Sequence, residues 1–290
     1  MNGETVVQYN STTFEIIEQF IQSKSGHLED CEDQIFFNDY FAVVIDGATS
    51  KSGLLQGNKA DGQIASQLVK DAFSQLTPYA TAREATNLAT IKIREYYQKV
   101  GIDRDVEINP SNRIAACFVA LSFARKECWL VGDCQCFIDS QKISNEKRVD
   151  KLLAEVRAMF LESEIIRGKS MSQLRYNDTG RDFILPLLER QSYFQNNPSL
   201  GDNWYPVVDG FDVPNEGILT FPLSDNARFV VLASDGYPSL QNTLSESEFL
   251  LHQLLEKDPL LFRECKMTKG LVNSQVSYDD RAYLRILVHT

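Results

Sequence analysis

The segment FAVVIDGATS, from Phe41 to Ser50, is a run of apolar and β-branched residues that stops at an aspartate. Asp46 is followed by Gly47 and then by small polar residues. Such a run is typical of a buried strand, and an Asp-Gly pair after a strand is most often a turn. One carboxylate at a strand end therefore indicates little by itself. The segment gains meaning only if other carboxylates are placed in the same way.

Three further apolar segments carry an acidic residue at one end, usually beside a glycine. They are CWLVGDC with Asp133, FVVLASDG with Asp235, and SYDDRAYLRI with Asp279. Each one alone is compatible with a turn, a bulge or a solvated loop. Carboxylates that meet at one end of a sheet repel one another strongly unless a cation compensates. Because oxygen ligands without sulfur or imidazole select Mg²⁺, Mn²⁺ or Ca²⁺, the set predicts a divalent-cation site.

The composition is that of an ordinary acidic globular protein. The chain has 290 residues, 43% of them hydrophobic, which is enough to bury a large core. Its formal net charge is -11, whereas nucleic acids and anionic membrane surfaces favour a basic face on a protein. We therefore expect no nucleic-acid partner and no membrane partner.

The chain shows no sequence signal for a membrane or for export. No apolar run approaches the ~20 residues of a membrane span, and the first residues, MNGETVVQYN, lack the basic and then apolar segments of a signal peptide. No two cysteines form a CxxC pair and several lie in apolar runs, so we expect reduced core thiols and a cytoplasmic location. The cysteines are Cys31, Cys117, Cys128, Cys134, Cys136 and Cys265.

Histidine is scarce, which limits the chemistry that the chain can perform. The three histidines are His27, His252 and His289, and no HExxH motif occurs. A Ser-His-Asp triad needs a well-placed imidazole base, and a catalytic zinc site usually needs several imidazoles. We therefore expect any catalysis to depend on carboxylates.

Short apolar segments occur in pairs that are separated by turn residues. DQIFFN and YFAVVID meet at Asn38-Asp39, and the strands IAACFVALSFA and ECWLVGDCQCFID are separated by Arg125-Lys126, as expected for hairpins. Helical patterns come in blocks rather than one per strand, which argues against a Rossmann-type parallel sheet. We predict an α+β fold, a four-layer α-β-β-α sandwich of two antiparallel sheets flanked by helices.

Three helical stretches have identifiable ends or faces. A helix is predicted from about Ala82 to Val100, with Thr81 as N-cap and Glu84 completing a capping box. A later helix is predicted to begin at Ser245, with Glu248 completing its capping box. Between them lies a charged helical section with one expected amphipathic stripe, formed by Leu152, Leu153, Val156, Met159 and Phe160.

Taken in order, the acidic segments resemble the metal-dependent protein phosphatases, the type 2C serine/threonine phosphatases. That family has an early Glu-Asp pair, a strand that ends in Asp-Gly, a Val-Gly-Asp-Ser segment, a Ser-Asp-Gly segment and a final Asp-Asn before the last strand. The resemblance extends from near residue 31 to residue 286 in the family's order. The corresponding segments here are Cys31-Glu32-Asp33, Asp46-Gly47, Val131-Gly132-Asp133-Cys134, Ser234-Asp235-Gly236 and Asp279-Asp280.

The resemblance implies two metal ions, Mg²⁺ or Mn²⁺, in a channel at one end of the sandwich. Asp46 would bridge the two ions, and the backbone carbonyl of Gly47 would bind one of them. Asp235 and Asp279 would hold the other ion. Asp133 would help to bind a third, weaker ion.

The resemblance also implies a hydrolase, a metal-dependent phosphomonoesterase that acts on phospho-Ser/Thr in proteins or on a small phosphoester. Glu32 would act through water and Asp33 would support the site, so that they form the catalytic set with Asp46. Two divalent ions about 3.5–4 Å apart can share a water, lower its pKa and direct it at phosphorus. We expect one phosphatase-like domain over residues 1–290, a monomer by default, with residues 144–216 as a variable helical and flap section.

Two departures from the family pattern bear on activity. The family commonly has an Arg shortly before its Glu-Asp pair, which grips the substrate phosphate, but this chain has Leu28 there, with His27 beside it and Lys24 further back. None of these replaces a planar guanidinium, so phosphate binding would depend on the metals or on a cation such as Arg113. Where many relatives have His or Met after Asp-Gly, this chain has Ala48.

Two other interpretations follow from the same residues. A pseudophosphatase would use the fold as a regulatory binding module, which the missing Arg favours and the retained acidic set opposes. A phosphatase of the haloacid dehalogenase type is suggested by VVIDGAT, but that chemistry needs Asp-x-Asp, and Val44 stands two positions before Asp46.

Overall fold

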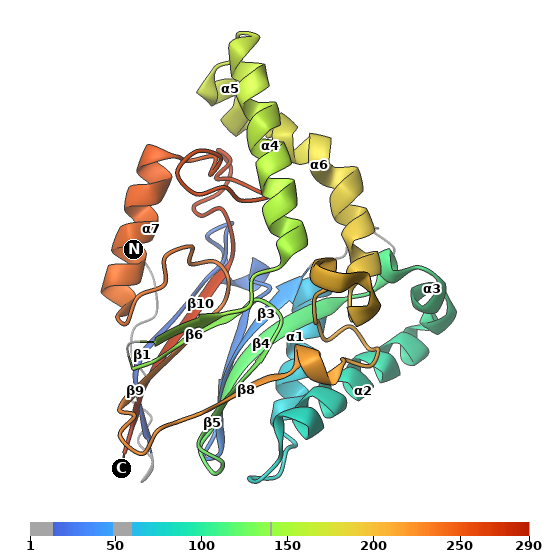
Figure 1. Ribbon diagram of the computed structural model, residues 1–290, viewed down its shortest axis with the longest axis vertical. Helices are drawn as coiled ribbons and strands as arrows, with labels where there is room; N and C mark the ends of the chain where they lie inside the picture. Colours follow the sequence, from blue (N-terminus) through green and yellow to red (C-terminus); the bar gives the residue numbers. More distant parts are fainter. Residues whose placement is uncertain (1–13, 49–59, 140, 290) are drawn as a thin grey trace.

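Two antiparallel β-sheets lie face to face, with helices outside both, in the computed structural model of the chain (Figure 1). The structure describes residues 14–48, 60–139 and 141–289. Residues packed between the sheets form one apolar core, and further cores lie between each sheet and its helices. The predicted α+β fold, a four-layer sandwich, is confirmed.

Each sheet has five strands among the described residues, and all pairings are antiparallel. Sheet A has the order β1 (Phe14–Gln22), β10 (Arg281–Val288), β9 (Phe229–Ala233), β6 (Gln135–Ile138) and β7 (Gln141–Ser144). Sheet B has the order β2 (Gln34–Phe37), β3 (Phe41–Ala48), β4 (Ala115–Ser122), β5 (Glu127–Val131) and β8 (Leu219–Pro222).

Helices cover the outer face of each sheet. α1 (Asp61–Phe73) and α2 (Ala82–Val100) pack on sheet B, and α7 (Leu244–Lys257) packs on sheet A. The other helices are α3 (Asp103–Ile108), α4 (Arg148–Ile166), α5 (Met171–Tyr176) and α6 (Thr179–Arg190), with 3-10 turns at Leu28–Asp30, Pro110–Asn112, Gln191–Phe194, Pro198–Asn203 and Asn215–Gly217. In the described part of the chain, no helix combines the length and the apolar character needed to cross a bilayer.

Strand β3 shows how the apolar run positions Asp46. Val43 and Ile45 pack toward α1 and α2, whereas Ala42 and Val44 pack into the core between the sheets. Both faces of the strand are therefore buried, which explains an unbroken apolar run. Because successive side chains point to opposite faces, Asp46 follows Val44 on the inner face and lies at the open end of the inter-sheet core.

The segment ECWLVGDCQCFID crosses from one sheet to the other, so our expectation of a single strand was wrong. Strand β5 belongs to sheet B and β6 to sheet A, and Asp133 lies in the crossover between them. Gly132 makes the crossover possible, because its φ is +90° and a Cβ there would lie 2.1 Å from the Sγ of Cys117. Only glycine adopts this conformation at such close contact without strain.

One predicted helix cap is confirmed and the other was wrong. The backbone N–H of Thr81 donates to the carboxylate of Glu84 at 2.8 Å, as the capping box requires. In α7 the N-cap is Thr243 rather than Ser245. Both residues are followed three positions later by a glutamate, so the sequence pattern did not distinguish between them. Glu248, the second of these glutamates, instead forms an ion pair of 2.7 Å with Arg281 of β10.

Helices α4, α5 and α6 project beyond the end of the two sheets (Figure 1). The amphipathic stripe predicted on α4 was wrong, because Leu152 is 50% exposed and Met159 is 69% exposed. The buried side of α4 instead contains Val149, Ala154, Arg157, Ala158 and Leu161. A buried arginine among small residues gives no apolar periodicity, so the sequence pattern pointed to the wrong face.

Arg157 joins this helical projection to the segment that precedes β10. Its side chain has no exposed surface, and its Nη2 lies 2.5 Å from the carboxylate of Asp178 at the start of α6. The same guanidinium donates to the backbone carbonyls of Leu260 at 2.9 Å and Met267 at 3.0 Å. These contacts fix residues 260–267 against α4 and α6.

Substitution of Asp178 by Ala should lower the free energy of unfolding by about 3 kcal/mol, because it leaves a buried guanidinium without its counter-ion. Urea denaturation measures the change. The control is Asp202→Ala, which breaks the exposed ion pair with Arg148 and should cost less than about 1 kcal/mol. Equal small losses in both variants would contradict the structural role of the buried pair.

Candidate metal centre

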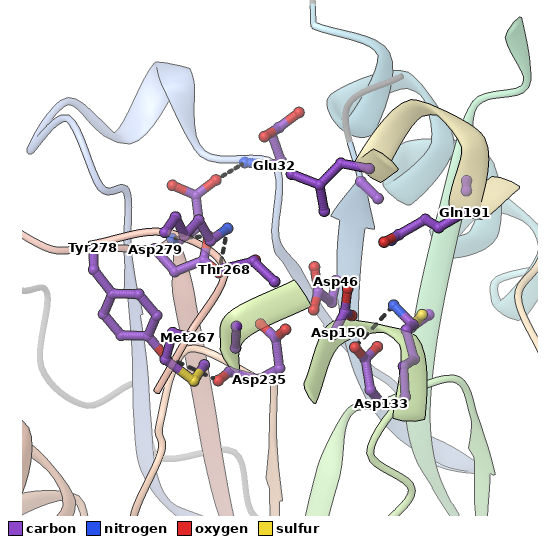
Figure 2. Close-up of a pocket in the computed structure, with 18 of the residues that line it drawn as sticks. Glu32, Asp46, Asp133, Asp150, Gln191, Asp235, Met267, Thr268, Tyr278 and Asp279 are labelled. Atoms are coloured by element: carbon purple, nitrogen blue, oxygen red, sulfur yellow. Dashed lines mark hydrogen bonds and ion pairs between the residues drawn. The ribbon is translucent and has the colours of Figure 1, made fainter. Parts of the chain in front are cut away.

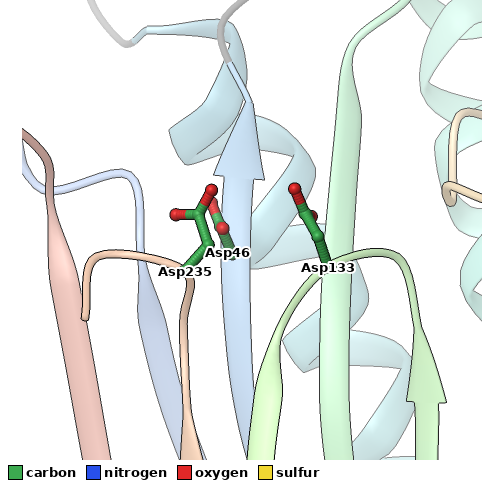
Figure 3. Close-up of side chains that lie close together, drawn as sticks. All are labelled: Asp46, Asp133 and Asp235. Atoms are coloured by element: carbon green, nitrogen blue, oxygen red, sulfur yellow. The ribbon is translucent and has the colours of Figure 1, made fainter. Parts of the chain in front are cut away.

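Three carboxylates from different parts of the chain meet at one end of the sandwich. Asp46, Asp133 and Asp235 each offer an oxygen, and these oxygens lie within 4.8 Å of one another (Figure 3). Asp46 lies in β3 of sheet B, Asp133 lies in the crossover from β5 to β6, and Asp235 follows β9 of sheet A. The structure therefore brings together three of the four strand-end aspartates that the sequence singled out.

The fourth aspartate, Asp279, lies outside this group of three oxygens. Its Oδ2 is 2.5 Å from the ammonium of Lys269, and its Oδ1 accepts a hydrogen bond of 3.0 Å from the backbone N–H of Asp280. Asp279 still lines the same cavity as the other three (Figure 2). Its carboxylate is thus close to the centre but turned to a lysine.

Glu32 and Asp33 lie behind the centre, as part of a buried polar network. Asp280, which replaces the Asn of the type 2C pattern, accepts hydrogen bonds from the backbone N–H groups of Lys24 at 2.7 Å and Glu32 at 2.9 Å. Glu32 also forms an ion pair of 2.9 Å with Lys24. Asp280 therefore neither faces water nor joins the three converging oxygens, but fixes the backbone that carries Glu32 and Asp33.

Gly47 permits a close approach of three backbone segments. A Cβ at this position would lie 2.2 Å from the carbonyl oxygen of Gly62 in α1 and 2.6 Å from that of Glu32. Any larger residue would push β3 away from α1 and from the segment that carries Glu32. The glycine after Asp46 is thus explained by packing around the centre.

Burial and mutual repulsion raise the pKa values of Asp33, Asp46 and Asp235. Burial raises the pKa of Asp46, and the nearby charges of Asp235 and Asp33 raise it further. Burial likewise raises the pKa of Asp33, with Asp280 the next cause. The pKa of Asp235 rises to about 7 through burial and the charges of Asp279 and Asp133. A cation in this space would relieve the repulsion.

Asp133 is the exception, because a lysine compensates its charge. Although burial opposes its ionisation, the ammonium of Lys147 at 2.8 Å holds the pKa of Asp133 below its usual range. Lys147, Lys269 and Asp150 all line the cavity, and none was identified from the sequence. No motif marks them, because Lys147 and Asp150 lie at the start of a charged helix and Lys269 lies in a long irregular segment.

The centre is the floor of a cavity of about 710 Å³. Helices α4 and α6 and residues 265–280 form its walls, and Figure 2 shows the acidic side chains turned into it. Cationic side chains surround the acidic floor, at Lys24, Lys147, Lys151, Arg181, Lys266 and Lys269. A cavity of this size is in the range that accepts small ligands or a single side chain.

The cations suggested by the sequence do not take the place of the missing arginine. Arg113 lines the cavity, but its Nη1 lies 3.0 Å from the buried carboxylate of Asp209, and its guanidinium stacks on Phe211 at 3.5 Å. His27 and Leu28 are exposed. Among the described residues, the other cations that line the cavity are Arg181 and the lysines around the floor.

The residues present fit a hard divalent cation. The three converging ligands are all carboxylates. Two buried oxygens of the centre, Asp33 Oδ2 and Asp133 Oδ1, have no hydrogen-bond partner within residues 14–48, 60–139 and 141–289. Such atoms are costly to bury unless an ion or water contacts them. Carboxylate oxygens are the ligands that Mg²⁺, Mn²⁺ and Ca²⁺ prefer.

Comparisons with known proteins find solved structures that match over nearly the whole chain, at low sequence identity and with TM-scores below 0.5. No family model and no curated protein matches the chain. The serine/threonine phosphatase Stp1 from Staphylococcus aureus is 13% identical, with a TM-score of 0.48 and 100% of both chains covered. RsbX in complex with magnesium is 8% identical, with a TM-score of 0.47 over 99% of this chain and 100% of that one. The catalytic domain of the serine/threonine protein phosphatase PstP with 2 manganese ions is 14% identical, with a TM-score of 0.44 over 99% and 97%.

Without divalent cations, the free energy of unfolding should fall as the pH rises from about 4 to about 7. The folded state holds the Asp235 proton up to a pH of about 7, whereas an aspartate of the unfolded chain releases it near about 3.9. Protons are thus lost on unfolding in this window, so higher pH favours the unfolded state. Urea titrations in EDTA at acidic and mildly alkaline pH measure the effect, and Asp235→Asn should reduce it. Greater stability at the alkaline pH would contradict this electrostatic description.

Proposed function

We propose that the chain is a metal-dependent phosphomonoesterase that dephosphorylates serine and threonine side chains of proteins. The observation that carries the proposal is the convergence of Asp46, Asp133 and Asp235 within 4.8 Å at the floor of a cavity. Both sheets contribute to this convergence, although it costs repulsion among buried carboxylates. Because these carboxylates repel one another in the absence of a cation, their convergence supports a cation-binding site.

The same proposal assigns the metal ligands and their supports. Asp46, Asp235 and Asp279, with the backbone carbonyl of Gly47, would hold two ions of Mg²⁺ or Mn²⁺. Bound divalent ions supply a water of lowered pKa and offset charge on the phosphoryl oxygens. Asp33, which is 2% exposed, would accept hydrogen bonds from water in the centre through its unpartnered oxygen.

The surrounding residues give the substrate its orientation. The acidic floor repels a phosphate, so the phosphoryl group needs bound metal or the cationic walls to enter. Arg181 lines those walls and would attract an anionic ligand. Lys151 and Lys266 also line them, but each already forms an ion pair with a glutamate. The walls come largely from residues 144–216 and 265–280, so we expect these segments to decide which phosphoprotein is accepted.

The proposal takes residues 1–290 as one phosphatase-like domain in the cytoplasm. The six cysteines are all free thiols, and five of them are buried. Thiols that persist without pairing are typical of a reducing compartment. An activity toward phosphoproteins is compatible with this location.

A regulatory binding module is the second candidate, and the lysines favour it. Lys147 already pairs with Asp133 and Lys269 already pairs with Asp279, at 2.8 Å and 2.5 Å. These ion pairs offset part of the acidic charge without any metal. A protein that bound phosphorylated partners through the cationic side chains of the walls, without hydrolysing them, would need no bound metal.

Hydrolysis of p-nitrophenyl phosphate and of phosphoseryl and phosphothreonyl peptides tests the proposal. We expect turnover with Mn²⁺ or Mg²⁺. We expect EDTA and Asp46→Asn each to remove it, because EDTA removes the cations and Asp46→Asn removes a carboxylate that would hold them. The control is Asp202→Asn, an exposed carboxylate outside the cavity lining, which should keep full activity. Turnover that survives both EDTA and Asp46→Asn would overturn the proposal, and intact Mn²⁺ binding without any turnover would favour the regulatory module.

A further inference from the structure

We propose that the ammonium group of Lys147 takes the place of a metal ion at Asp133, so that the centre binds two divalent cations and excludes a third. This inference rests on the proposed function. It concerns the number of ions, which the converging carboxylates alone leave open. It also gives a role to a buried lysine that no sequence motif marks.

The ion pair between Lys147 and Asp133 is enclosed. The Nζ of Lys147 lies 2.8 Å from Oδ2 of Asp133, and the two side chains are only 14% and 10% exposed. The ring of Tyr205 lies 5.2 Å from the same ammonium, a distance at which an aromatic face attracts a cation. A pair this far from solvent is screened much less by salt than a surface pair.

The backbone around Lys147 is anchored to the segment that carries Asp133. Lys147 is the last residue before α4 and is held in an extended conformation. Two residues earlier, the side-chain amide of Asn145 donates to the carbonyl of Gly132 at 3.3 Å. The ammonium is therefore placed by a short tethered link to the same crossover, and not by a free side chain alone.

The position of the ammonium excludes a cation from that oxygen. A divalent cation contacts a carboxylate oxygen at about 2.0–2.6 Å. Because the ammonium already lies 2.8 Å from Asp133 Oδ2, a metal on that oxygen would lie within about 5 Å of a second positive charge. Two positive groups at such a separation repel strongly in a buried site. The other oxygen, Oδ1, has no hydrogen-bond partner in the described part of the chain and remains available to a cation shared with Asp46 and Asp235.

Lys269 does not limit the centre in the same way. Its side chain is 36% exposed, so it has solvent to move into when a cation claims Asp279. The side chain of Lys147 is 14% exposed and is held under Tyr205. The permanent cation is therefore Lys147, and Lys269 is the displaceable one.

Counting bound Mn²⁺ by equilibrium dialysis, with electron paramagnetic resonance for the free ion, tests the proposal. We expect two ions per wild-type chain and three in Lys147→Met, because Oδ2 of Asp133 is then free to bind a further ion. Lys147→Arg keeps the charge and should bind two. The matched control is Lys151→Met, which removes another cavity lysine whose partner, Glu146, is exposed, and it should also bind two.

The double variant Lys147→Met/Asp133→Asn separates the inference from a general loosening of the site. We expect it to return to two ions, because the gained ion needs the Asp133 carboxylate. The inference would be overturned if Lys147→Met bound the same number of Mn²⁺ ions as the wild type with the same affinity. It would also be overturned if the wild type bound three ions, a result that does not depend on the folding of any variant. A wild type that binds no Mn²⁺ would instead overturn the proposed function.

Discussion

Repulsion among partly buried carboxylates is the constraint on which the arrangement of this molecule depends. Two sheets that share one apolar core deliver Asp46, Asp133 and Asp235 to the same end of that core. Apolar burial stabilises the sandwich but removes the water that would otherwise screen these charges. The ammonium groups of Lys147 and Lys269 offset part of this charge at the edge of the centre. The space between the three carboxylates suits a divalent cation.

The helical projection and the segment before β10 form the walls that surround this space. Arg157 connects them through Asp178 and through the carbonyls of residues 260 and 267. Further along the same segment, Lys269 reaches Asp279. The walls are thus connected to the acidic floor, and to the candidate metal ligand Asp279, by a series of direct contacts.

The parts that could be predicted from the sequence were those set by local periodicity and chain order. The position of Asp46 near the end of β3 was predictable because an apolar run buried on both faces stops there, although the strand itself continues to Ala48. Thr81 was predictable as a cap because its partner is three residues away. The role of Lys147 could not be predicted, because its contact with Asp133 depends on how the chain crosses from one sheet to the other. The face of α4 was predicted wrongly because Arg157, a charged residue, is buried there through bonds to distant carbonyls.

Anomalous diffraction from a crystal soaked in Mn²⁺ tests the central claim most directly. If the converging carboxylates form a metal centre, the map should show manganese within coordination distance of Asp46 and Asp235, beside the ammonium of Lys147. A map without a peak between these carboxylates, from crystals that diffract well in saturating Mn²⁺, would contradict the account.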